Sequence, residues 1–388
     1  MSKKTDIHTS VETGKFQAAL AIVSKALGKS TLPVLTTIHI EAQEDAIALT
    51  ATDLETSNRI STPADIAKSW SACAPGSTLT SLAAAAPGQE VDLTWEEESA
   101  TLHVRSLGTK AKLKSLAADE FPHAKASKTQ KMGILPAAEL RNALKRVLIA
   151  ASADESRPAL CTVQLALINE RFYLAAADGF RLAAYHLDYE IIFPSKTSLL
   201  LPRNAASKLA AILPDDDTPV QVSVLDDDRA LSFAWDTVNF RAQLADFKFP
   251  DWQAIFPVEF KHELYLNSKS FQDAVRRAEI FARESNKVLK LAPDENGMRV
   301  YGEASETGRG ETILDEAIMP ILIGFNVTFI RQGLEAIGVG QVRMRLSAAN
   351  TPALFTNGSD KFRYLVMPVM TGEEAIRAAD AAQSAEAA

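Results

Sequence analysis

Residues 28–31 read Gly-Lys-Ser-Thr, which matches the end of a phosphate-binding loop motif. Such a loop needs a glycine five residues before the Gly-Lys pair, because its backbone N–H groups must fold around the phosphates. That position is Val23, and the preceding residues 15–27 have the apolar spacing of a helix, not of the strand that a phosphate-binding loop follows. The sequence therefore predicts that Gly28 ends a helix and that Lys29 places a positive charge at its C-terminus.

A few other side chains could do acid–base chemistry if the fold brought them together. Asp53 with Glu55, and Asp178 with Arg181, are the candidates. However, Asp178 precedes Gly179 in a hairpin-turn signal, which favours turn chemistry over catalysis. The six histidines lack metal-ligand spacing, and neither GxSxG nor a dinucleotide fingerprint occurs. The pattern predicts no catalytic site, no metal site and no cofactor.

The elements that must position any functional side chain follow a repeat of about 125 residues. Each repeat opens with an amphipathic helix, at 15–27, 137–151 and 270–283. A β-rich stretch around a polar turn comes next, at 48–61, 174–187 and 300–314, and then a shorter helix, at 78–86, 203–213 and 326–337. We expect three α+β domains, each with two helices on a largely antiparallel sheet. Their predicted bounds are 1–127, 128–257 and 258–371, followed by a mobile C-terminal tail at 372–388.

Two acidic runs interrupt the strands that close the first two repeats. Residues 96–98 are three glutamates and residues 226–228 are three aspartates. Each run separates two alternating segments, so we interpret them as solvated hairpin loops and not as metal sites.

Composition is that of an ordinary globular protein, with 388 residues of which 47% are hydrophobic. No apolar run approaches the length of about 18 residues that spans a bilayer, and residues 1–10 have no apolar core of a secretory signal. Cys73 and Cys161 provide no disulfide framework. A cytoplasmic protein is expected.

Positive charge gathers in a chain whose formal net charge is −8. Four helical segments, at 13–31, 138–150, 203–213 and 267–290, together carry a net charge of +10. At 100° per residue, Lys25, Arg146 and Arg277 fall on the helix faces that point away from their own sheets. The pattern predicts a surface lined by helices that binds a polyanion. Since no zinc-finger, helix-turn-helix or RNP signature occurs, that surface is expected to contact phosphates regardless of sequence.

Several short motifs together resemble one known family. "TLPVL" and "LTATDLE", followed by "AAADGFRLA", "FPDW", "GFNV" and "YLVMPV", resemble in order and spacing the bacterial sliding clamp, the β subunit of DNA polymerase III. The resemblance runs from about residue 6 to residue 370. It implies a processivity factor without catalytic activity of its own, in which two chains join head to tail around duplex DNA, with helices inside and sheets outside.

The resemblance implies a peptide-binding groove between the second and third domains, where polymerases and the clamp loader insert short motifs. The matching positions are Leu160, Gly179, Phe180, Arg181, Leu182, Pro250, Ile255, Phe329, Leu365, Val366, Met367 and Pro368. Their apolar side chains suit an adaptable surface for many similar partners. Phe180 stands where the family often has His or Tyr, and Ala177 and Ala254 are smaller than usual there, which bears on partner preference.

The other positions implied by the resemblance concern DNA and the second chain. The DNA-facing residues are Lys25, Lys29, Arg146, Arg157, Arg203 and Arg277. At the dimer joint, Lys110, Lys112 and Leu113 of one chain are expected to face Ile280, Phe281, Glu303 and Glu306 of the other. Opposite charges would set the register of that joint. The alternative from another class is a three-domain enzyme whose site the motif search does not detect.

Overall fold

The structure is a computed structural model that describes residues 8–29, 32–123, 128–193, 197–225 and 229–369. The chain forms two compact units, and each is described by itself. Unit 1 comprises Met1–Arg141 and Tyr189–Ala245, and unit 2 comprises Asn142–Asp188 and Asp246–Ala388. The division passes through the second predicted domain, so α3 (Ala137–Leu148) begins in unit 1 and ends in unit 2. The predicted tail at 372–388 and the aspartates at 226–228 lie outside the described residues.

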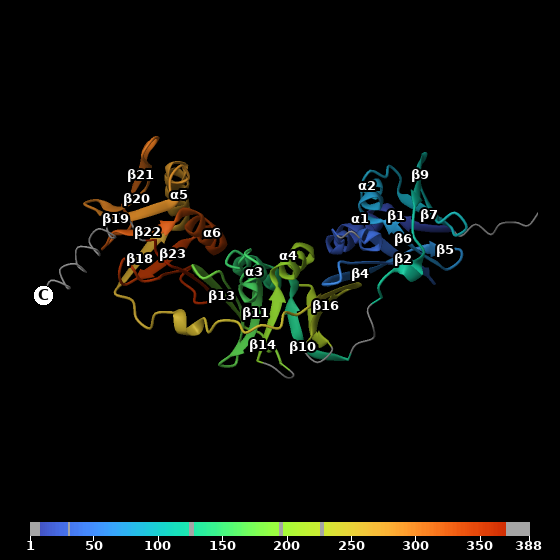
Figure 1. Ribbon diagram of the computed structural model, residues 1–388, viewed down its shortest axis with the longest axis horizontal. Coiled ribbons are helices and arrows are strands. Elements are labelled where there is room, and N and C mark those ends of the chain that lie inside the picture. The colour runs from blue at the N-terminus through green and yellow to red at the C-terminus, as the bar shows by residue number, and fades with distance from the viewer. Residues whose placement is uncertain (1–7, 30–31, 124–127, 194–196, 226–228, 370–388) are drawn as a thin grey trace, which may run out of the picture. The chain divides into compact units, whose positions relative to one another are not determined.

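Unit 1 is built on two antiparallel sheets with the strand orders β5-β1-β7-β8-β9 and β10-β15-β16-β17-β4-β3-β2-β6 (Figure 1). The helices are α1 (Thr13–Val23), α2 (Gly76–Ala84) and α4 (Arg203–Ile212), with 3-10 turns at Ser24–Ala26, Pro33–Thr36 and Ala118–Glu120. The strands are β1 (His8–Glu12), β2 (Thr37–Gln43), β3 (Ala46–Thr52), β4 (Thr56–Pro63), β5 (Asp65–Ile66), β6 (Trp70–Pro75), β7 (Glu90–Glu96), β8 (Thr101–Ser106), β9 (Thr109–Lys114), β10 (Thr129–Pro136), β14 (Ser198–Pro202), β15 (Pro219–Leu225), β16 (Ala230–Trp235) and β17 (Val238–Gln243).

Unit 2 contains one sheet that includes the order β11-β12-β13-β25-β24-β23-β18 and a second with the order β21-β20-β19-β22. Its helices α5 (Ser268–Ala282) and α6 (Val327–Ile337) pack against each other, and 3-10 turns lie at Pro158–Leu160 and Gln253–Ile255 (Figure 1). The strands are β11 (Thr162–Ile168), β12 (Arg171–Ala177), β13 (Arg181–Leu187), β18 (His262–Asn267), β19 (Val288–Asp294), β20 (Gly297–Ala304), β21 (Gly308–Leu314), β22 (Ile323–Asn326), β23 (Gln341–Leu346), β24 (Ala353–Thr356) and β25 (Phe362–Val366).

The helices form where the apolar spacing predicts them. In α1 the predicted stripe residues Phe16, Leu20 and Val23 are fully buried, and burying each such side chain contributes roughly 1.5–3 kcal/mol. In α5, Asn267 caps the first turn by accepting the backbone N–H groups of Lys269 and Ser270 at 3.0 and 3.1 Å. Each helix begins directly after a strand, so a strand and its helix are placed together.

Gly28 lies just beyond the helical segment, as expected for a stop signal. The regular helix ends at Val23, earlier than predicted, and a 3-10 turn continues to Ala26. The Gly28 N–H donates to the Leu35 carbonyl at 2.9 Å, and a Cβ built on Gly28 would lie 3.1 Å from the Cβ of Leu35. Glycine therefore allows a close approach of the chain here. The helix before it, in place of a strand, excludes the phosphate-binding loop.

Two antiparallel ladders join the sheets of successive predicted domains. In joint 1, β4 pairs with β17, and in joint 2, β13 pairs with β25. Both joints have the same strand arrangement: the strand after the polar turn of one domain pairs with the last strand of the next domain. Each joint lies within one unit, joint 1 in unit 1 and joint 2 in unit 2.

Candidate nucleic-acid and peptide interfaces

The polar turns before β4 and β13 are built by aspartates, which confirms the interpretation as turn chemistry. The Asp178 carboxylate accepts the N–H groups of Phe180 and Arg181 at 2.9 and 3.0 Å, and Gly179 adopts a φ of 92°. Asp53 accepts the N–H and hydroxyl of Thr56 at 2.7 and 2.9 Å in the same way. Both carboxylates are thus occupied in holding backbone, which is the use expected of Asp in turns.

Asp53 is also the acceptor of the Lys208 ammonium group on α4. Burial opposes ionisation of the Asp53 carboxyl, but hydrogen bonds from Lys208 and Thr56 outweigh it and lower its pKa. The side chains of both residues are about one-sixth exposed, at 15% for Asp53 and 16% for Lys208. Lys208, counted among the basic residues of its segment, is therefore engaged with its own chain.

Joint 2 brings together two of the segments predicted for the peptide groove. Arg181 and Leu182 pair with Val366 and Leu365 respectively. The ladder continues beyond the strands, because the Met367 N–H donates to the Phe180 carbonyl at 2.8 Å. Residues far apart in the sequence thus become neighbours at the end of one ladder.

Arg181 is the centre of a polar cluster at this end of joint 2. Its Nε donates to Asp178 at 2.9 Å, and its Nη1 donates to Gln332 on α6. Its guanidinium carbon lies 4.2 Å from the ring centroid of Phe329, a cation–π contact. The Tyr364 hydroxyl donates to the Phe329 carbonyl at 3.0 Å, and burial raises the pKa of Tyr364 to about 12. Phe329 is therefore held from both its ring and its backbone.

The predicted groove residues divide into exposed and buried groups. Phe180, Ile255 and Met367 are exposed by 58%, 44% and 38%. Leu182, Leu365 and Val366 are almost fully buried and act as core residues beneath them, and Leu160, Phe329 and Pro368 are partly exposed. The exposed group supplies the side chains that a partner can reach.

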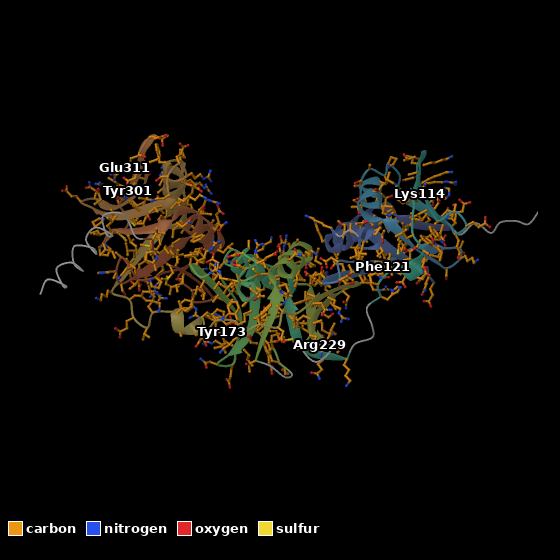
Figure 2. All side chains as sticks on the ribbon, viewed as in Figure 1. Lys114, Phe121, Tyr173, Arg229, Tyr301 and Glu311 are labelled. Carbon is orange, nitrogen blue, oxygen red and sulfur yellow. The ribbon has the colours of Figure 1, made fainter. Side chains whose placement is uncertain are left out.

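Sequence reasoning missed the anchor of the segment that carries Ile255. Trp252 is buried, and its indole N–H donates to the Gln164 side chain of β11 at 2.7 Å. The Arg363 guanidinium lies 4.7 Å from the ring centroid of Phe256 and 5.6 Å from that of Tyr173, which Figure 2 labels. The available signal was the tryptophan of "FPDW", since a large aromatic side chain in a loop usually packs onto the core.

The residues predicted to face DNA differ in how they are placed. Lys25, Lys29, Arg203 and Arg277 are exposed, although the Arg277 Nε donates to Thr312 at 3.0 Å. Arg146 is different: its guanidinium carbon lies 5.8 and 5.4 Å from two ring centroids, those of Tyr185 on β13 and Phe362 on β25.

The expectation that Arg146 points away from its sheet is therefore wrong. Aromatic ring faces attract the guanidinium, and helical periodicity does not reveal what a neighbouring strand offers. Burial lowers the pKa of Arg146, as desolvation does for any cation.

Arg157 lies beside the predicted groove. A Cβ built on Gly179 would come within 2.8 Å of the Arg157 Nη1, so this side chain covers the turn of Asp178 and Gly179. Arg157 also pairs with Asp154 at 3.7 Å, and it lies before a 3-10 turn and not on a helix.

The residues predicted for the dimer joint lie on sheet edges. β9 is the outermost strand of its sheet, and Lys110 and Lys112 are exposed on it while Leu113 is buried. β21 is likewise an outermost strand; Figure 2 labels Lys114 on β9 and Glu311 on β21. Both strands leave one side of their backbone without a ladder partner among the described residues.

The side chains around β21 combine an apolar surface with ion pairs. Ile280 is 65% exposed on α5. The Phe281 ring covers Gly310, where a built Cβ would lie 2.3 Å from the ring. Glu303 pairs with Lys290, and Glu311 pairs with Arg309 at 2.9 Å. Glu306 is exposed in the turn before β21.

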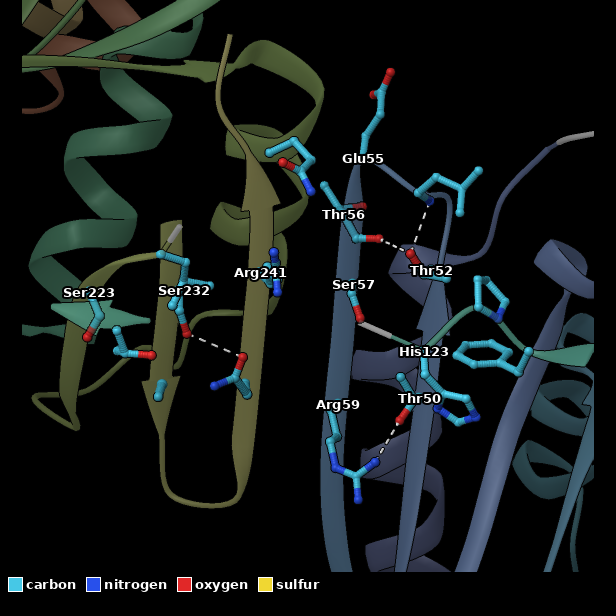
Figure 3. A pocket seen from close by; sticks show the side chains of 18 of the residues that line it. Thr50, Thr52, Glu55, Thr56, Ser57, Arg59, His123, Ser223, Ser232 and Arg241 are labelled. Atoms are coloured by element: carbon cyan, nitrogen blue, oxygen red, sulfur yellow. Dashed lines mark hydrogen bonds between the residues drawn. The ribbon is translucent and has the colours of Figure 1, made fainter. Parts of the chain in front are cut away.

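A pocket of about 700 Å³ in unit 1 contains none of the positions predicted for DNA, the peptide groove or the dimer joint, and of the acid–base candidates only Glu55 lines it. Hydroxyl, amide and guanidinium side chains from β3, β4, β15, β16 and β17 form it, with His123 at one side (Figure 3). Ser57 and Arg241 face each other across joint 1 there, and Ser232 donates to Asn239 at 3.3 Å. The pocket therefore lies on the ladder that joins the first two predicted domains.

Family comparisons cover nearly the whole chain. The N-terminal, central and C-terminal domains of the DNA polymerase III beta subunit match residues 7–125, 134–251 and 253–370 in turn. The chain belongs to the DNA polymerase III beta subunit family. As a member of that family it is a DNA sliding clamp, the non-catalytic processivity subunit of DNA polymerase III, so the resemblance in the sequence is confirmed and the enzyme alternative is not supported.

Individual relatives agree with the family assignment. The beta sliding clamp of Synechococcus elongatus is 24% identical over 364 residues, covering 92% of this chain and 97% of that one. The beta sliding clamp of Staphylococcus aureus is 26% identical over 356 residues, covering 88% and 93%. Both relatives are matched over almost their full length.

Solved beta subunits share the fold. The sliding clamp of Bacillus subtilis has a TM-score of 0.85 at 23% identity, covering 95% of this chain and all of that chain. The clamp of Pseudomonas aeruginosa bound to griselimycin has a TM-score of 0.87 at 24% identity, covering 94% and 100%. The predicted α+β fold of three clamp domains is confirmed. Among the described residues, no helix is long and apolar enough to cross a membrane.

Proposed function

We propose that two copies of this chain join head to tail into a ring around duplex DNA and recruit polymerases and the clamp loader through one peptide groove on each chain. The domain bounds 1–127, 128–257 and 258–371, and a cytoplasmic location beside the DNA, belong to the same proposal. The observation that carries it is the arrangement of strands at the two joints.

Each joint uses the strand after a polar turn and the last strand of the following domain. Two strands of these kinds have one edge without a ladder partner in the part of the chain that the structure describes: β21, after the turn of the third domain, and β9, the last strand of the first. Pairing β9 of one copy with β21 of another repeats the same joint, and two such pairings close a dimer.

The internal joints also predict the register of that pairing. Ala51 on β3 and Gly302 on β20 are equivalent, because each lies five residues after the start of its strand. Ala51 pairs with Asn58 on β4, and Gly302 pairs with Gly310 on β21, so Asn58 and Gly310 are equivalent too. Phe240, which pairs with Asn58 across joint 1, corresponds to Ala111 because each lies two residues into its strand. We therefore place Ala111 opposite Gly310.

One residue further along the two strands, that register sets Lys110 opposite Glu311. It also sets Leu113 opposite Gly308, on the face where the Phe281 ring and α5 lie. On the outer side of the joint, Lys110 would then face the opposite charge of Glu311, and Lys112 would stand opposite Arg309, a cation that Glu311 pairs with at 2.9 Å. Apolar groups would meet on the inner side. Glu303 and Glu306, predicted as partners from the resemblance, lie at the end of the paired region.

DNA contact is proposed for the exposed basic residues of the helical segments. Lys25, Lys29, Arg203 and Arg277 are exposed, which supports contact with phosphates. Such contacts are weak one by one and sensitive to salt. We assign Arg146 mainly to joint 2 and Arg157 to the groove, because their guanidinium groups contact residues of those regions.

Retention on circular DNA tests this proposal. After assisted loading, the protein should stay on nicked circles and leave when they are linearised. Changing Lys25, Lys29, Arg203 and Arg277 to Glu should impair loading without changing the dimer mass. The matched control changes the exposed Lys68, Lys131, Lys248 and Lys261 to Glu and should load normally. Equal retention on circles and linear DNA would contradict a ring.

The peptide groove is proposed around the exposed Phe180, Ile255 and Met367, with Phe329 held by Arg181. An extended peptide with apolar side chains would bury them there, at roughly 1.5–3 kcal/mol for each one fully buried. The entropy of association offsets much of that, so we expect Kd values of about 1–10 μM.

Titration of a fluorescent clamp-binding peptide tests the groove. Phe180→Ala with Met367→Ala should weaken binding at least tenfold, because both side chains are exposed and their loss leaves the core intact. Ile318→Ala with Val339→Ala, at two other exposed apolar positions, is the matched control. Undiminished binding to the first variant would show that the groove is elsewhere.

A further inference from the structure

The pocket on joint 1 lies where the chain repeats the surroundings of the proposed peptide groove on joint 2. In the polar turn of the first domain, Asp53 accepts the N–H groups of the residues two and three further along, at 3.2 and 2.7 Å. In the polar turn of the second domain, Asp178 accepts the corresponding N–H groups at 2.9 and 3.0 Å. Glu55, which lines the pocket, is therefore the counterpart of Phe180, one of the exposed groove residues.

The strand opposite each turn extends this equivalence. In both joints the backbone carbonyl of the turn residue accepts an N–H group at 2.8 Å, that of Gln243 in joint 1 and that of Met367 in joint 2. A Phe-Pro pair also occurs after the last strand of the first domain, at 121–122, and of the second domain, at 249–250. Gln243 and residues 121–122 all line the pocket, so the pocket is formed by the counterparts of groove residues.

Two residues further into each ladder, the side chains that face each other differ in kind. Joint 2 has Leu182 opposite Leu365, and both are almost fully buried. Joint 1 has Ser57 opposite Arg241, and both are partly exposed and line the pocket. The pocket on joint 1 thus has a hydroxyl and a guanidinium group where the proposed groove has two leucines.

A second guanidinium group lies beside the first on the same face of the sheet. Arg59 is two residues beyond Ser57 on β4, so their side chains point to one face. It pairs with Asn239, which is two residues before Arg241 on β17. Figure 3 shows Arg59 and Arg241 on these two strands. The two arginines therefore stand on a diagonal of paired strands, where residues lie about 7–8 Å apart.

The charge and the polar groups of the pocket suit an acidic peptide. Among the described lining residues, the charged ones at neutral histidine are Arg59, Arg241 and Glu55, two cations and one anion in a chain of net charge −8. Arg59 donates to Glu41 and Thr50 through Nη1 alone, and a guanidinium has five N–H donors in a fork that matches a carboxylate. Most of the other lining side chains are hydroxyls and amides, which can bond to the backbone of a peptide.

We infer that this pocket is a second docking site of the chain, which binds an extended acidic peptide with carboxylates two residues apart. In an extended chain, side chains two residues apart point the same way and lie about 7 Å from each other, which matches the diagonal of Arg59 and Arg241. Glu55 repels a carboxylate at its own end of the pocket, and so limits where the acidic residues bind. The inference rests on the proposed groove only for the comparison between joints.

Fluorescence anisotropy with the full chain at pH 7 tests this site. The probe is a labelled peptide of nine glycines and serines in which glutamates replace positions 4 and 6. It should bind about tenfold more tightly than the same peptide with glutamines at those positions. A peptide with glutamates at positions 4 and 5 should bind about threefold more weakly than the probe, because adjacent side chains of an extended chain point to opposite faces.

Variants of the two arginines test the assigned residues. Arg241→Gln and Arg59→Gln should each weaken binding of the probe about tenfold, because each removes one partner of a carboxylate. The Arg59 side chain is 51% exposed, so the second variant keeps the test valid if the first lowers stability. Arg171→Gln, at an exposed arginine of β12, is the matched control and should bind the probe as the unchanged protein does.

Four results would each overturn the inference. They are equal binding of the glutamate and glutamine peptides, equal binding of the peptide with adjacent glutamates, unchanged binding to either Arg241→Gln or Arg59→Gln, and displacement of the probe by inorganic phosphate at the same molar concentration. The last result would indicate a site for a lone anion.

The proposed groove is tested separately. Phe180→Ala with Met367→Ala should leave binding of the acidic probe unchanged, and loss of the probe from that variant would place the probe in the groove and overturn the inference. If the same variant keeps its affinity for the clamp-binding peptide, the proposed groove fails. The arginine variants then still decide whether the pocket on joint 1 binds an acidic peptide.

Discussion

His39 is a buried ionisable side chain without a hydrogen bond to either ring nitrogen among the described residues. It is 2% exposed, with its ring stacked on Phe121 at a centroid distance of 4.9 Å and edge-on to His123 at 5.0 Å. Burial lowers the pKa of His39 to about 4; Glu41 opposes that shift, and His123 and Arg59 add to it. The folded protein therefore keeps this imidazole neutral.

We predict that His39 makes the folded protein less stable toward unfolding as the pH is lowered. Between the unfolded pKa of His39, near 6.5, and its folded pKa of about 4, the unfolded chain binds a proton that the folded chain does not. The contribution of His39 to stability is therefore fully present above pH 6.5. It decreases as the pH falls, by up to about 1.4 kcal/mol per pH unit. Urea unfolding of the full chain at pH 7, 6 and 5 measures it. His39→Phe should remove most of this slope, and an unchanged slope would contradict the assignment.

At the scale of elements, the contact of α5 with β20 depends on Gly302. A Cβ built on Gly302 would lie 2.2 Å from the Ala278 carbonyl oxygen and 3.0 Å from the Cβ of Ala282, both on α5. We predict that Gly302→Ala forces the helix away and costs about 1–3 kcal/mol, seen as a lower thermal midpoint. Gly14→Ala is the matched control: its nearest atom is 3.8 Å away, so stability should stay equal or rise.

The positions of the helices and strands were largely predictable from the sequence. The contacts that their side chains make with other elements were not. The spacing of Phe16, Leu20 and Val23 identified α1 because a helix buries one stripe. The same spacing could not show that Arg146 meets Tyr185 and Phe362, since those rings lie on strands from other parts of the chain. Periodicity describes a face, whereas a contact depends on the partner element.

The candidate site shows the same limit. The resemblance located Arg181 and Met367, and the ladder of joint 2 does bring their segments together. It did not indicate Gln332 or Trp252, whose roles depend on hydrogen bonds to residues of other elements. It also assigned Leu182 to a binding surface although the side chain is in the core.

At the scale of the whole molecule, we predict that a charge exchange across the joint between copies identifies its register. Lys110→Glu and Glu311→Lys should each loosen the dimer about tenfold, a free energy of about 1.4 kcal/mol, because each places like charges opposite one another. The two together should restore most of the affinity. Sedimentation equilibrium measures the dimer Kd. A double variant that dissociates more than either single variant would exclude the pairing of these two residues.

The continuity of the sheets across joints 1 and 2 limits how the protein can be divided. The second domain contributes one strand to each joint, β17 to joint 1 and β13 to joint 2. Excised from its neighbours, that domain would carry two bare and mutually complementary edges, the kind that invites strand addition. Copies of it would bind one another in series, so truncation of this chain to one domain creates a self-associating fragment, and covering both edges is a condition for keeping any shorter version in solution.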